Sequence, residues 1–349
     1  MYPAIAVLQT MQNKVDVLWV GGEGGMETRL VERANVPFKT IPAAGLHGVG
    51  LKSLPGNLIR LVRGFFTARR ILQQFKPDVL FFTGGYVAVP MAFAGMHIPS
   101  ALFVPDIEPG LALKTLARFA DKIAVIAQES FRFFSQKDRV ILTGYPTRSD
   151  LARWTQYDAH RVLGLTSEMP VLLVIGGSRG ARSINNAVLD NLSALLEQAQ
   201  IIHITGELDW PTVQTRMKNL NKAQSARYHA SPYLHDEMGA ALAAADLALS
   251  RAGASTLGEY PLFGLPAILV PYPHAWRYQK VNADTLVNKG AAVMLEDQKL
   301  SEGLLPLVND LLHQPQKLAS MGAAMKQLSH PEAAEEISRQ LFALCGERR

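Results

Sequence analysis

A glycine-rich turn that follows an apolar run is the stretch of this sequence best suited to chemistry. Residues 171–175 are apolar and β-branched, which predicts a strand buried on both faces. Gly176-Gly177-Ser178-Arg179-Gly180 ends the run, and a helical pattern follows. Glycine lets the backbone approach an anion, the first amides of a helix point at that anion, and the helix dipole favours its charge. The turn is therefore a candidate phosphate site, although a tight turn that needs glycine for steric reasons alone would leave the same pattern.

A second turn of the same kind strengthens the phosphate interpretation. Residues 245–250 predict a short strand, which ends at Arg251-Ala252-Gly253-Ala254-Ser255-Thr256. A helical run over 257–263 follows, with Glu259 in its first turns. Two such turns in one α/β unit indicate a single diphosphate held between two helix N-termini.

Strands and helices alternate along the chain, which predicts an α/β fold of parallel sheets covered by helices on both faces. The chain begins directly with a helical pattern, and no strand precedes it. In the first half, strands are expected at 15–20, 38–41, 79–82, 101–104, 122–126 and 140–142, with helices at 26–34, 58–75 and 90–96. In the second half, strands are expected near residues 171, 201, 227, 247, 267 and 292.

Two doubly wound, Rossmann-like domains that face a cleft fit this alternation. Turn residues at 144–148 and a polar stretch up to about residue 165 mark the boundary. We expect an N-terminal domain over 1–146 and a C-terminal domain over 147–330. A final helix within 331–349 is long enough to cross back to the first domain.

The composition is that of a folded protein of 349 residues, with 48% hydrophobic and 19% charged residues. Cys345 is the single cysteine, so no disulfide forms within the chain and a reducing compartment is expected. No apolar run approaches the roughly 20 residues of a membrane-spanning helix, and no secretory signal pattern is present, so we expect a soluble or peripheral cytoplasmic protein. The net charge of +5 permits anionic partners. Nucleic acid is not an expected partner, because no aromatic stacking platform or known motif accompanies the charge.

One helical segment combines arginines with apolar residues and lacks acidic ones. Residues 58–70 hold four arginines among Leu, Ile, Val and a pair of Phe. Such a basic amphipathic helix can lie on an anionic membrane surface, where each basic residue adds about 1 kcal/mol. A helix that covers the sheet and turns its arginines to water would have the same pattern. The residues expected at a membrane are Arg60, Arg63, Phe65, Phe66 and Arg69.

Several motifs resemble, in their order and spacing, the glycosyltransferases of family 28, which have the GT-B fold of two Rossmann-like domains. The match runs along nearly the whole chain, and no single motif is decisive alone. The motifs are Pro77-Asp78-Val79 with Gly84-Gly85-Tyr86-Val87, Gly144-Tyr145-Pro146-Thr147-Arg148, Gly176 to Arg182, Arg251 to Glu259, Gly264-Leu265-Pro266-Ala267 with Val270-Pro271, and Gln279 ahead of Asn282-Ala283.

Within this family the chain is most similar to the peptidoglycan branch. The resemblance implies transfer of N-acetylglucosamine from UDP-GlcNAc to undecaprenyl-pyrophosphoryl-muramoyl-pentapeptide, which converts lipid I to lipid II at the cytoplasmic face of the cell membrane. It also implies inversion at the anomeric carbon by in-line attack. No cofactor is expected, and the sequence has no metal motif such as His-Glu-x-x-His.

The resemblance also implies roles for individual residues. Ser178 and the amides after it would bind the diphosphate, and Arg148 and Arg251 would supply positive charge to the leaving UDP. An ionised Glu259 would accept hydrogen bonds from the ribose hydroxyls, with a helix-terminal charge as its alternative role. The backbone near His235 would face the uracil, and Gln279 would contact the sugar. The alternative roles are a surface ion pair for Arg251 and an ordinary loop residue for His235. The full set implied for the UDP-sugar is Arg148, Ser178, Arg179, Gly180, His235, Arg251, Ala254, Ser255, Thr256, Leu257, Gly258, Glu259 and Gln279.

The chain departs from the family pattern at its beginning. The family opens with a strand and a glycine-rich loop that ends in His, just before the x-x-Pro-Ala that here is Met1-Tyr2-Pro3-Ala4. We favour an upstream start over a true loss of this segment, because removal of a central parallel strand would expose two unpaired neighbours.

A second departure follows the strand at 101–104. Val104-Pro105-Asp106-Ile107 stands where the peptidoglycan enzymes have His-Glu-Gln-Asn, a segment that helps to build their donor and acceptor site. The acceptor can therefore differ from lipid I. Since the usual histidine is absent, Asp106 and Glu108 are the candidates for the general base, with loop solvation or helix capping as their alternative role. His274 is a further polar group expected near the cleft.

Three functions remain open at this point. The first is the peptidoglycan N-acetylglucosaminyltransferase, and the second is a related enzyme that glycosylates another lipid, such as a diacylglycerol. The third is a non-catalytic protein that binds a UDP-sugar without turnover. A UDP-sugar epimerase would share the fold, but its carboxylate pattern is not seen here.

Overall fold

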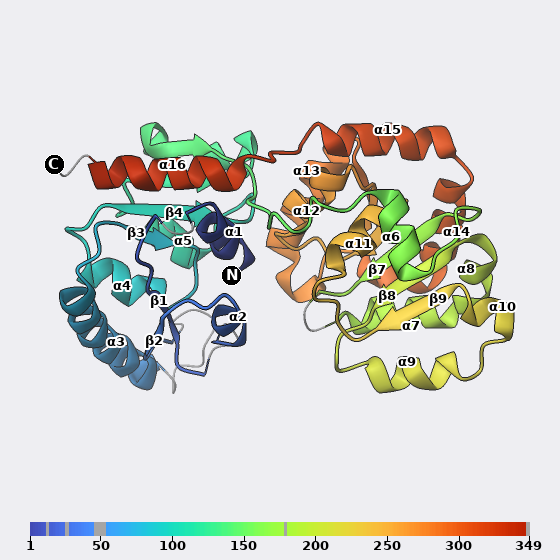
Figure 1. Cartoon of the computed structure of the whole chain (residues 1–349), viewed down its shortest axis with the longest axis horizontal. Coiled ribbons are helices and arrows are strands. Elements are labelled where there is room, and N and C mark those ends of the chain that lie inside the picture. Colours follow the sequence, from blue (N-terminus) through green and yellow to red (C-terminus); the bar gives the residue numbers. More distant parts are fainter. Residues whose placement is uncertain (12–13, 25–27, 45–53, 178–179, 347–349) are drawn as a thin grey trace. The chain divides into compact units, whose positions relative to one another are not determined.

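The computed structural model describes residues 1–11, 14–24, 28–44, 54–177 and 180–346. The chain divides into two compact units (Figure 1): unit 1 contains Met1–Arg148 and Pro331–Arg349, and unit 2 contains Ser149–His330. Every strand pairing in the described residues is parallel. The predicted α/β fold with parallel sheets is therefore confirmed.

Unit 2 is built on one six-stranded sheet. Its strands, in their order across the sheet, are β12 (Ala292–Met294), β11 (Ala267–Leu269), β10 (Leu247–Ser250), β7 (Val171–Ile175), β8 (Gln200–Ile204) and β9 (Tyr228–Ser231).

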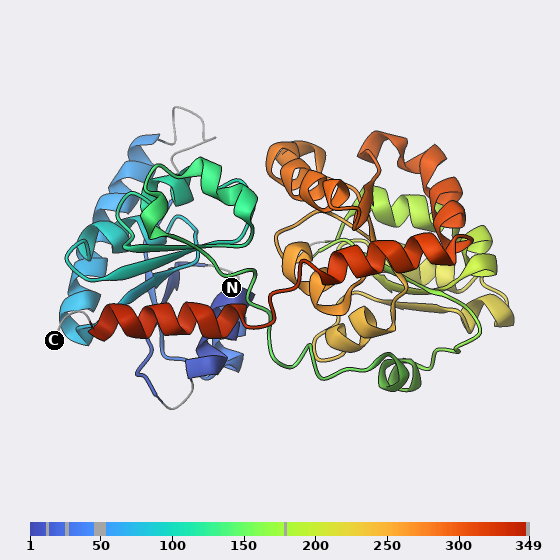
Figure 2. The ribbon, with the colours of Figure 1, turned by 90° about the horizontal axis from the view of Figure 1, so that it is seen from above.

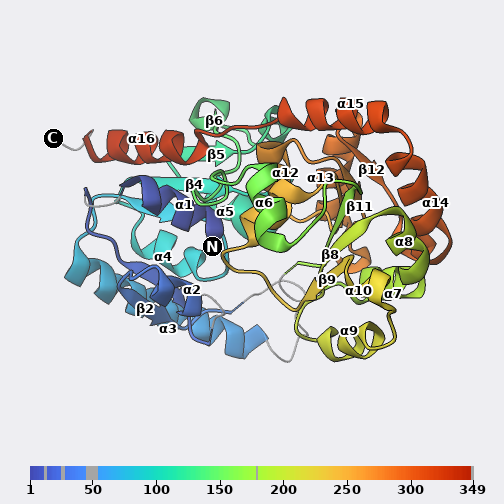
Figure 3. The same cartoon turned by 45° about the vertical axis from the view of Figure 1, so that its right-hand side comes forward.

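Helices cover both faces of this sheet. One face carries α7 (Arg182–Asp190), α8 (Leu192–Gln198), α9 (Trp210–Met217) and α14 (Leu300–Leu312). The other face carries α6 (Gln156–Leu163), α11 (Met238–Ala244), α12 (Thr256–Phe263) and α13 (Trp276–Asn288), and Figure 3 shows α13 near β12. The short α10 (Lys222–Ser225) precedes β9, the turns η4 (Pro273–Ala275) and η5 (Asp297–Lys299) follow β11 and β12, and α15 (Pro315–Lys326) contacts both α12 and α14.

The central strand β7 explains why this sheet is covered on both sides. Leu172 and Val174 pack into the core with α7, α8 and α14, whereas Val171 and Leu173 pack into the core with α6, α11 and α12. Successive side chains of a strand point to opposite faces, so an uninterrupted apolar run fills both cores.

Unit 1 contains two parallel sheets. The larger has the order β3 (Leu80–Phe82), β4 (Ser100–Val104), β5 (Lys122–Val125) and β6 (Val140–Leu142), and the smaller pairs β1 (Trp19–Gly22) with β2 (Phe38–Ile41). Its helices are α1 (Tyr2–Met11), α2 (Thr28–Arg33), α3 (Leu54–Phe75), α4 (Ala88–Ala94), α5 (Leu111–Leu116) and α16 (Ala333–Gly346), with short turns η2 (Gln128–Phe133) and η3 (Lys137–Arg139).

The last helix of the chain packs against the first. Figures 1 and 2 both show α16 beside α1. The hydroxyls of Thr10 and Ser338 share a hydrogen bond, and Ser338 Oγ also donates to the carbonyl of Val7 at 3.4 Å. Unit 1 is therefore assembled from both ends of the chain.

Some element boundaries differ from those expected. The strand expected at 15–20 begins at Trp19 and runs to Gly22, because its partner β2 supplies backbone groups only from Phe38 to Ile41. The helix expected from residue 58 begins at Leu54, with Pro55 in its first turn, where the missing N–H has no helical partner to lose.

Candidate functional site

The carboxyl edge of the unit 2 sheet brings the two glycine turns together. β7 and β10 are neighbours, and their register sets Ile175 beside Ser250. These are the last residues of the two strands, so the turns that begin at Gly176 and Arg251 leave the sheet side by side. Open parallel sheets bind ligands at this edge. One ligand could span both turns in this arrangement.

The first turn is folded tightly against the end of β8. Gly180 has a φ of +77°, and a Cβ on it would lie 2.3 Å from the carbonyl oxygen of Thr205. Only glycine fits there. Ala181 is the N-cap of α7, and its methyl group cannot accept a hydrogen bond from the first amides of the helix. Ser178 and Arg179, both predicted to bind the diphosphate, lie outside the described residues.

The second turn is held by side chains from within unit 2. The buried Asn282 on α13 donates from Nδ2 to the carbonyl of Ala252 at 3.1 Å. Thr256 Oγ1 donates to the carbonyl of Gly253 at 2.6 Å, and Ser255, the N-cap of α12, makes no side-chain capping bond. The turn backbone is thus fixed while the first amides of α12 have no side-chain cap.

Unlike Gly180, Gly253 is required neither by close contacts nor by its backbone conformation. Its φ lies outside the positive range that favours glycine, and an added Cβ would meet no heavy atom within 4 Å among those described. Packing and backbone conformation therefore leave this glycine unexplained. A ligand approaching the turn backbone would explain it.

The remaining predicted residues of this turn lie on or beside α12. Ala254 precedes the helix, and Leu257, Gly258 and Glu259 form its first turns, with Gly258 buried and Glu259 half-buried. The next residue, Tyr260, is fully buried and donates its hydroxyl to Ser250 Oγ at 2.7 Å. That bond ties α12 to the end of β10.

Gln279 and His235 follow other strands of the same sheet. Gln279 lies on α13 after β11, and its Oε1 accepts a hydrogen bond from the amide of Tyr272 at 2.8 Å. This bond directs the carboxamide and leaves its Nε2 group as the end that can donate to a ligand. His235 follows the edge strand β9, is exposed, and lies with its ring centroid 4.5 Å from that of Tyr233.

The two arginines predicted to supply charge have other partners. Arg148 is the last residue of the N-terminal segment of unit 1, where its guanidinium carbon lies 4.8 Å from the ring centroid of Tyr2. Arg251 belongs to unit 2 and donates to Asp297 and Ser183 within that unit. The structure thus gives Arg251 a largely buried ion pair, whereas the sequence offered a surface pair as the alternative to phosphate binding.

The two candidates for the general base follow β4 in unit 1. Glu108 is buried and its Oε1 lies 3.3 Å from Nζ of Lys114 on α5. A buried carboxylate with a lysine partner suits a structural ion pair. Asp106 is half-buried and is the more accessible of the two.

A buried polar network behind the first turn was missed in the sequence. His203 on β8 accepts at Nδ1 from the hydroxyl of Tyr228, 2.7 Å away, and contacts Asn185 Oδ1 through Nε2 at 3.0 Å. Asn185 donates from Nδ2 to the carbonyl of Thr205 and to Asp209, which orients its oxygen toward the histidine. An amide oxygen only accepts, so the network assigns the proton of a neutral imidazole to Nε2.

This network fastens the start of α7 to β8. Asn185 lies in the second turn of α7, and Arg182 in the first turn donates from Nε to Asp209 Oδ1 at 3.0 Å. Burial lowers the pKa of His203 to about 3, against a smaller opposing effect of Asp209. A histidine inside the apolar strand 200–204 was the signal that could have revealed it.

The long helix α3 has two apolar faces. Gly64, Ala68, Ile71 and Leu72 are buried against unit 1, and a Cβ on Gly64 would lie 2.2 Å from the carbonyl oxygen of Pro42. A separate group of large apolar side chains on the same helix is exposed: Leu58, Ile59, Val62 and Phe66.

The predicted membrane residues are distributed around this exposed group. Arg60, Arg63 and Arg69 are exposed, Phe66 is 63% exposed, and Phe65 is half-buried. The helix therefore covers the sheet and still presents apolar and basic side chains to its surroundings. No helix in the described part of the chain combines the length and apolar character needed to cross a bilayer.

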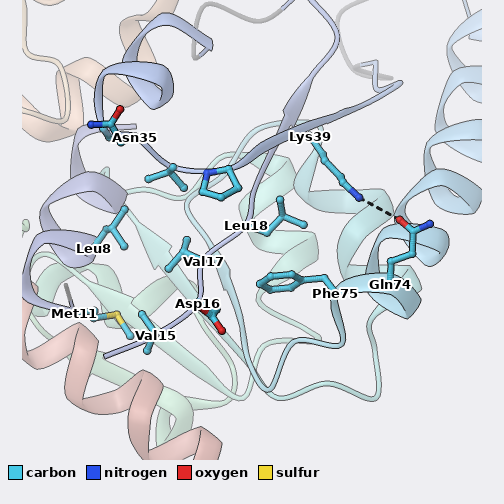
Figure 4. Close-up of a pocket in the computed structure, with 13 residues that line it drawn as sticks. Leu8, Met11, Val15, Asp16, Val17, Leu18, Asn35, Lys39, Gln74 and Phe75 are labelled. Carbon is cyan, nitrogen blue, oxygen red and sulfur yellow. Dashed lines mark hydrogen bonds between the residues drawn. The ribbon is translucent and has the colours of Figure 1, made fainter. Parts of the chain in front are cut away.

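Unit 1 also contains a hollow of about 750 Å³ (Figure 4). Val15, Val17 and Leu18, which precede β1, line it together with Val36 and Pro37, which precede β2. It therefore lies at the amino ends of these strands, opposite to the edge where parallel sheets bind ligands. Its lining is mostly apolar, so the hollow lacks the features of a phosphate site.

Fold and site together define a class: an α/β protein of two parallel-sheet units, one of which presents paired glycine turns suited to a nucleotide diphosphate. The chain belongs to glycosyltransferase family 28. The family's N-terminal domain matches residues 1–125, and its C-terminal domain matches residues 171–337. The resemblance inferred from the motifs is confirmed, and the chain is a glycosyltransferase.

Similar proteins cover almost the whole chain. It is 37% identical over 348 residues to UDP-N-acetylglucosamine--N-acetylmuramyl-(pentapeptide) pyrophosphoryl-undecaprenol N-acetylglucosamine transferase of Desulforamulus reducens, a match that covers 96% of this chain and 93% of the relative. The protein of the same name from Desulforudis audaxviator is 38% identical over 359 residues, covering 99% and 95%. Among solved structures, MurG of Acinetobacter baumannii matches with a TM-score of 0.74 and 25% identity, covering 98% of this chain and 95% of that one.

Proposed function

We propose that this chain transfers N-acetylglucosamine from UDP-GlcNAc to a polyprenyl-pyrophosphate-linked muramoyl-pentapeptide, the reaction for which its relatives are named. The observation that carries the proposal is the register that sets Ile175 beside Ser250, because it places two glycine turns at one point of the sheet edge. This transfer converts lipid I to lipid II in peptidoglycan synthesis. The protein would then serve cell wall biogenesis, and through it cell shape and division.

In this proposal unit 2 binds the donor. The turn at 176–180, with Ser178, Arg179 and Gly180, and the turn at 253–256 hold the diphosphate between the starts of α7 and α12. Glu259 binds the ribose, and the backbone beside His235 faces the uracil. Gln279 contacts the sugar through Nε2, since its Oε1 is already bonded to Tyr272.

The chemical step is an in-line displacement. The acceptor hydroxyl oxygen forms a bond to the anomeric carbon, the bond from that carbon to the diphosphate breaks, and its electron pair leaves with UDP, which inverts the centre. The helix starts meet the charge on the leaving diphosphate, so the proposal requires no metal ion. Asp106 takes the proton of the hydroxyl, since it is the more accessible of the two candidate carboxylates.

Unit 1 supplies the acceptor and membrane side. The exposed apolar residues of α3 insert between lipid chains, and its arginines contact anionic headgroups. The protein would then lie peripherally on the cytoplasmic face of the cell membrane, where a lipid-linked acceptor can reach it.

The test is transfer of labelled N-acetylglucosamine from UDP-GlcNAc to a lipid I analogue in detergent or anionic vesicles. Formation of a lipid II analogue, with inverted configuration by NMR and in the presence of a metal chelator, would support the transfer, its stereochemistry and its independence of a metal ion. UDP binding without transfer would point to another lipid acceptor, as the altered segment 104–107 permits. Absence of UDP binding would overturn the proposal.

A further inference from the structure

The guanidinium of Arg251 makes four contacts inside unit 2. Nη1 donates to the carbonyl of Val270 at 3.1 Å and to Asp297 Oδ1 at 2.5 Å, and Nη2 donates to Ser183 Oγ at 2.8 Å. Ser183 Oγ in turn donates to the same Asp297 oxygen at 2.7 Å. The ring centroid of Tyr272 lies 5.3 Å from the guanidinium carbon.

Arg251 and its partners follow four neighbouring strands. Arg251 directly follows β10, Val270 directly follows β11, Asp297 lies in η5 after β12, and Ser183 lies in the first turn of α7 after β7. The sheet order is β12-β11-β10-β7, so the four loops are adjacent at the carboxyl edge. One guanidinium therefore ties together the ends of four strands, including both strands that carry the glycine turns.

The charge of Arg251 is matched within this cluster. Only 11% of the Arg251 side chain and 18% of the Asp297 side chain are exposed. A largely buried pair of this kind is costly to break, because either partner left alone is a buried, unpaired charge. If the guanidinium moved to an anionic ligand, Asp297 would lose its main partner.

We propose that Arg251 and Asp297, with Ser183, are positioning residues that hold the two phosphate-binding turns in register, and that Arg251 does not itself bind the diphosphate. This inference rests on the proposed donor site. It assigns the charge of the leaving diphosphate to the backbone amides of the two turns, and it gives Asp297, which no motif singled out, a role equal to that of Arg251.

The experiment is a double-mutant cycle read in UDP affinity. Isothermal titration calorimetry measures the UDP affinity of the full chain, of Asp297→Asn, of Arg251→Met and of the double variant. We expect each single variant to weaken UDP binding by about tenfold, and the double variant to be no weaker than the single ones, because the two residues act as a unit. Ser183→Ala, which removes one hydroxyl from the cluster, should give a smaller loss in the same direction.

The UDP affinity of Asp297→Asn can also contradict the positioning role. If Arg251 binds the diphosphate directly, Asp297→Asn frees it from a competing anion, so that UDP binding by this variant stays as tight as in the parent or becomes tighter.

Asp190→Asn, which breaks the exposed ion pair with Arg216 and removes the same charge, is the matched control and should bind UDP like the parent. The unfolding temperature of each variant shows whether weaker UDP binding comes from displaced turns or from unfolding of the whole unit. A parent chain that binds no UDP would overturn the donor site itself, whereas unimpaired binding by Asp297→Asn would overturn only the positioning role.

Discussion

At the scale of single residues, Gly253 gives a direct test of ligand approach to the second turn. An alanine methyl group has room in the described structure and needs no unusual backbone angle. We therefore expect Gly253→Ala to unfold at the parent temperature within a degree or two but to bind UDP about tenfold more weakly, because the methyl group occupies the path of the phosphate. Gly346→Ala, where the added methyl group meets no described atom within 4 Å, is the control and should leave the UDP affinity unchanged. Unchanged UDP affinity in Gly253→Ala would place the diphosphate elsewhere.

The buried His203 predicts how stability depends on pH. Burial holds the pKa of His203 at about 3 in the folded chain, whereas it is near 6.5 in the unfolded chain. The unfolded chain therefore binds the extra proton below pH 6.5 and the folded chain does not, so the free energy of unfolding falls as the pH drops from 6.5 toward 3. The slope from this group approaches about 1.4 kcal/mol per pH unit.

Urea unfolding at pH 8, 6.5 and 5 measures this dependence in the parent and in His203→Gln. Burial also lowers the pKa of His229 and His330, so part of the loss at low pH persists in the variant. We expect His203→Gln to be less stable at pH 8 but to lose less stability on acidification. Parallel curves for the two proteins would contradict the assignment of this effect to His203.

At the scale of secondary-structure elements, the exposed face of α3 predicts membrane binding. Val62 and Phe66 are one helical turn apart and both are exposed, so Val62→Ser with Phe66→Ser should leave the fold of unit 1 intact. Sedimentation with vesicles containing anionic lipid should show strong loss of binding in this double variant, because inserted apolar area is removed. Tyr157→Ser in unit 2 replaces a side chain that is 76% exposed and should bind vesicles like the parent. Equal binding by all three proteins would argue against an α3 contact with lipid.

The helices and strands were largely predictable from the sequence, whereas the pairing of the strands and the contacts between distant side chains were not. The apolar runs at 38–41 and 140–142 gave β2 and β6 at their observed bounds, because short runs between turn residues have few alternative structures. The start of β1 at Trp19 depended on where β2 could pair with it. The partners of Arg251 lie as far as 68 residues away in the sequence, so only the order of the strands shows that Asp297 and Ser183 meet it.

In the candidate site, too, local patterns were predictable from the sequence and contacts between distant residues were not. Each glycine turn was visible as a local pattern, and the register between β7 and β10 then set them side by side. The Tyr228–His203–Asn185 network could not be read from local pattern, because its members come from β9, β8 and α7. A polar residue within an apolar run marks such a network without naming its partners.

At the scale of the whole molecule, the two units have separate cores, and unit 1 depends on the C-terminal helix. Leu341 on α16 is 3% exposed, and Ile337 and Leu344 on the same helix are also buried. Leu341→Ala should destabilise unit 1 by about 2–5 kcal/mol, because it removes buried apolar volume. Unit 2 has its own two apolar clusters, which contain no residue of α16.

Calorimetry with and without UDP can separate the two units. We expect two unfolding transitions. UDP at about 100 times its Kd should raise the free energy of unfolding of unit 2 alone, by about 2.7 kcal/mol. Leu341→Ala should lower only the other transition, and its UDP affinity should match that of the parent even though transfer is reduced. A single transition that responds to both the substitution and UDP would mean that the two units unfold as one, and weaker UDP binding by Leu341→Ala would mean that the donor site in unit 2 depends on α16.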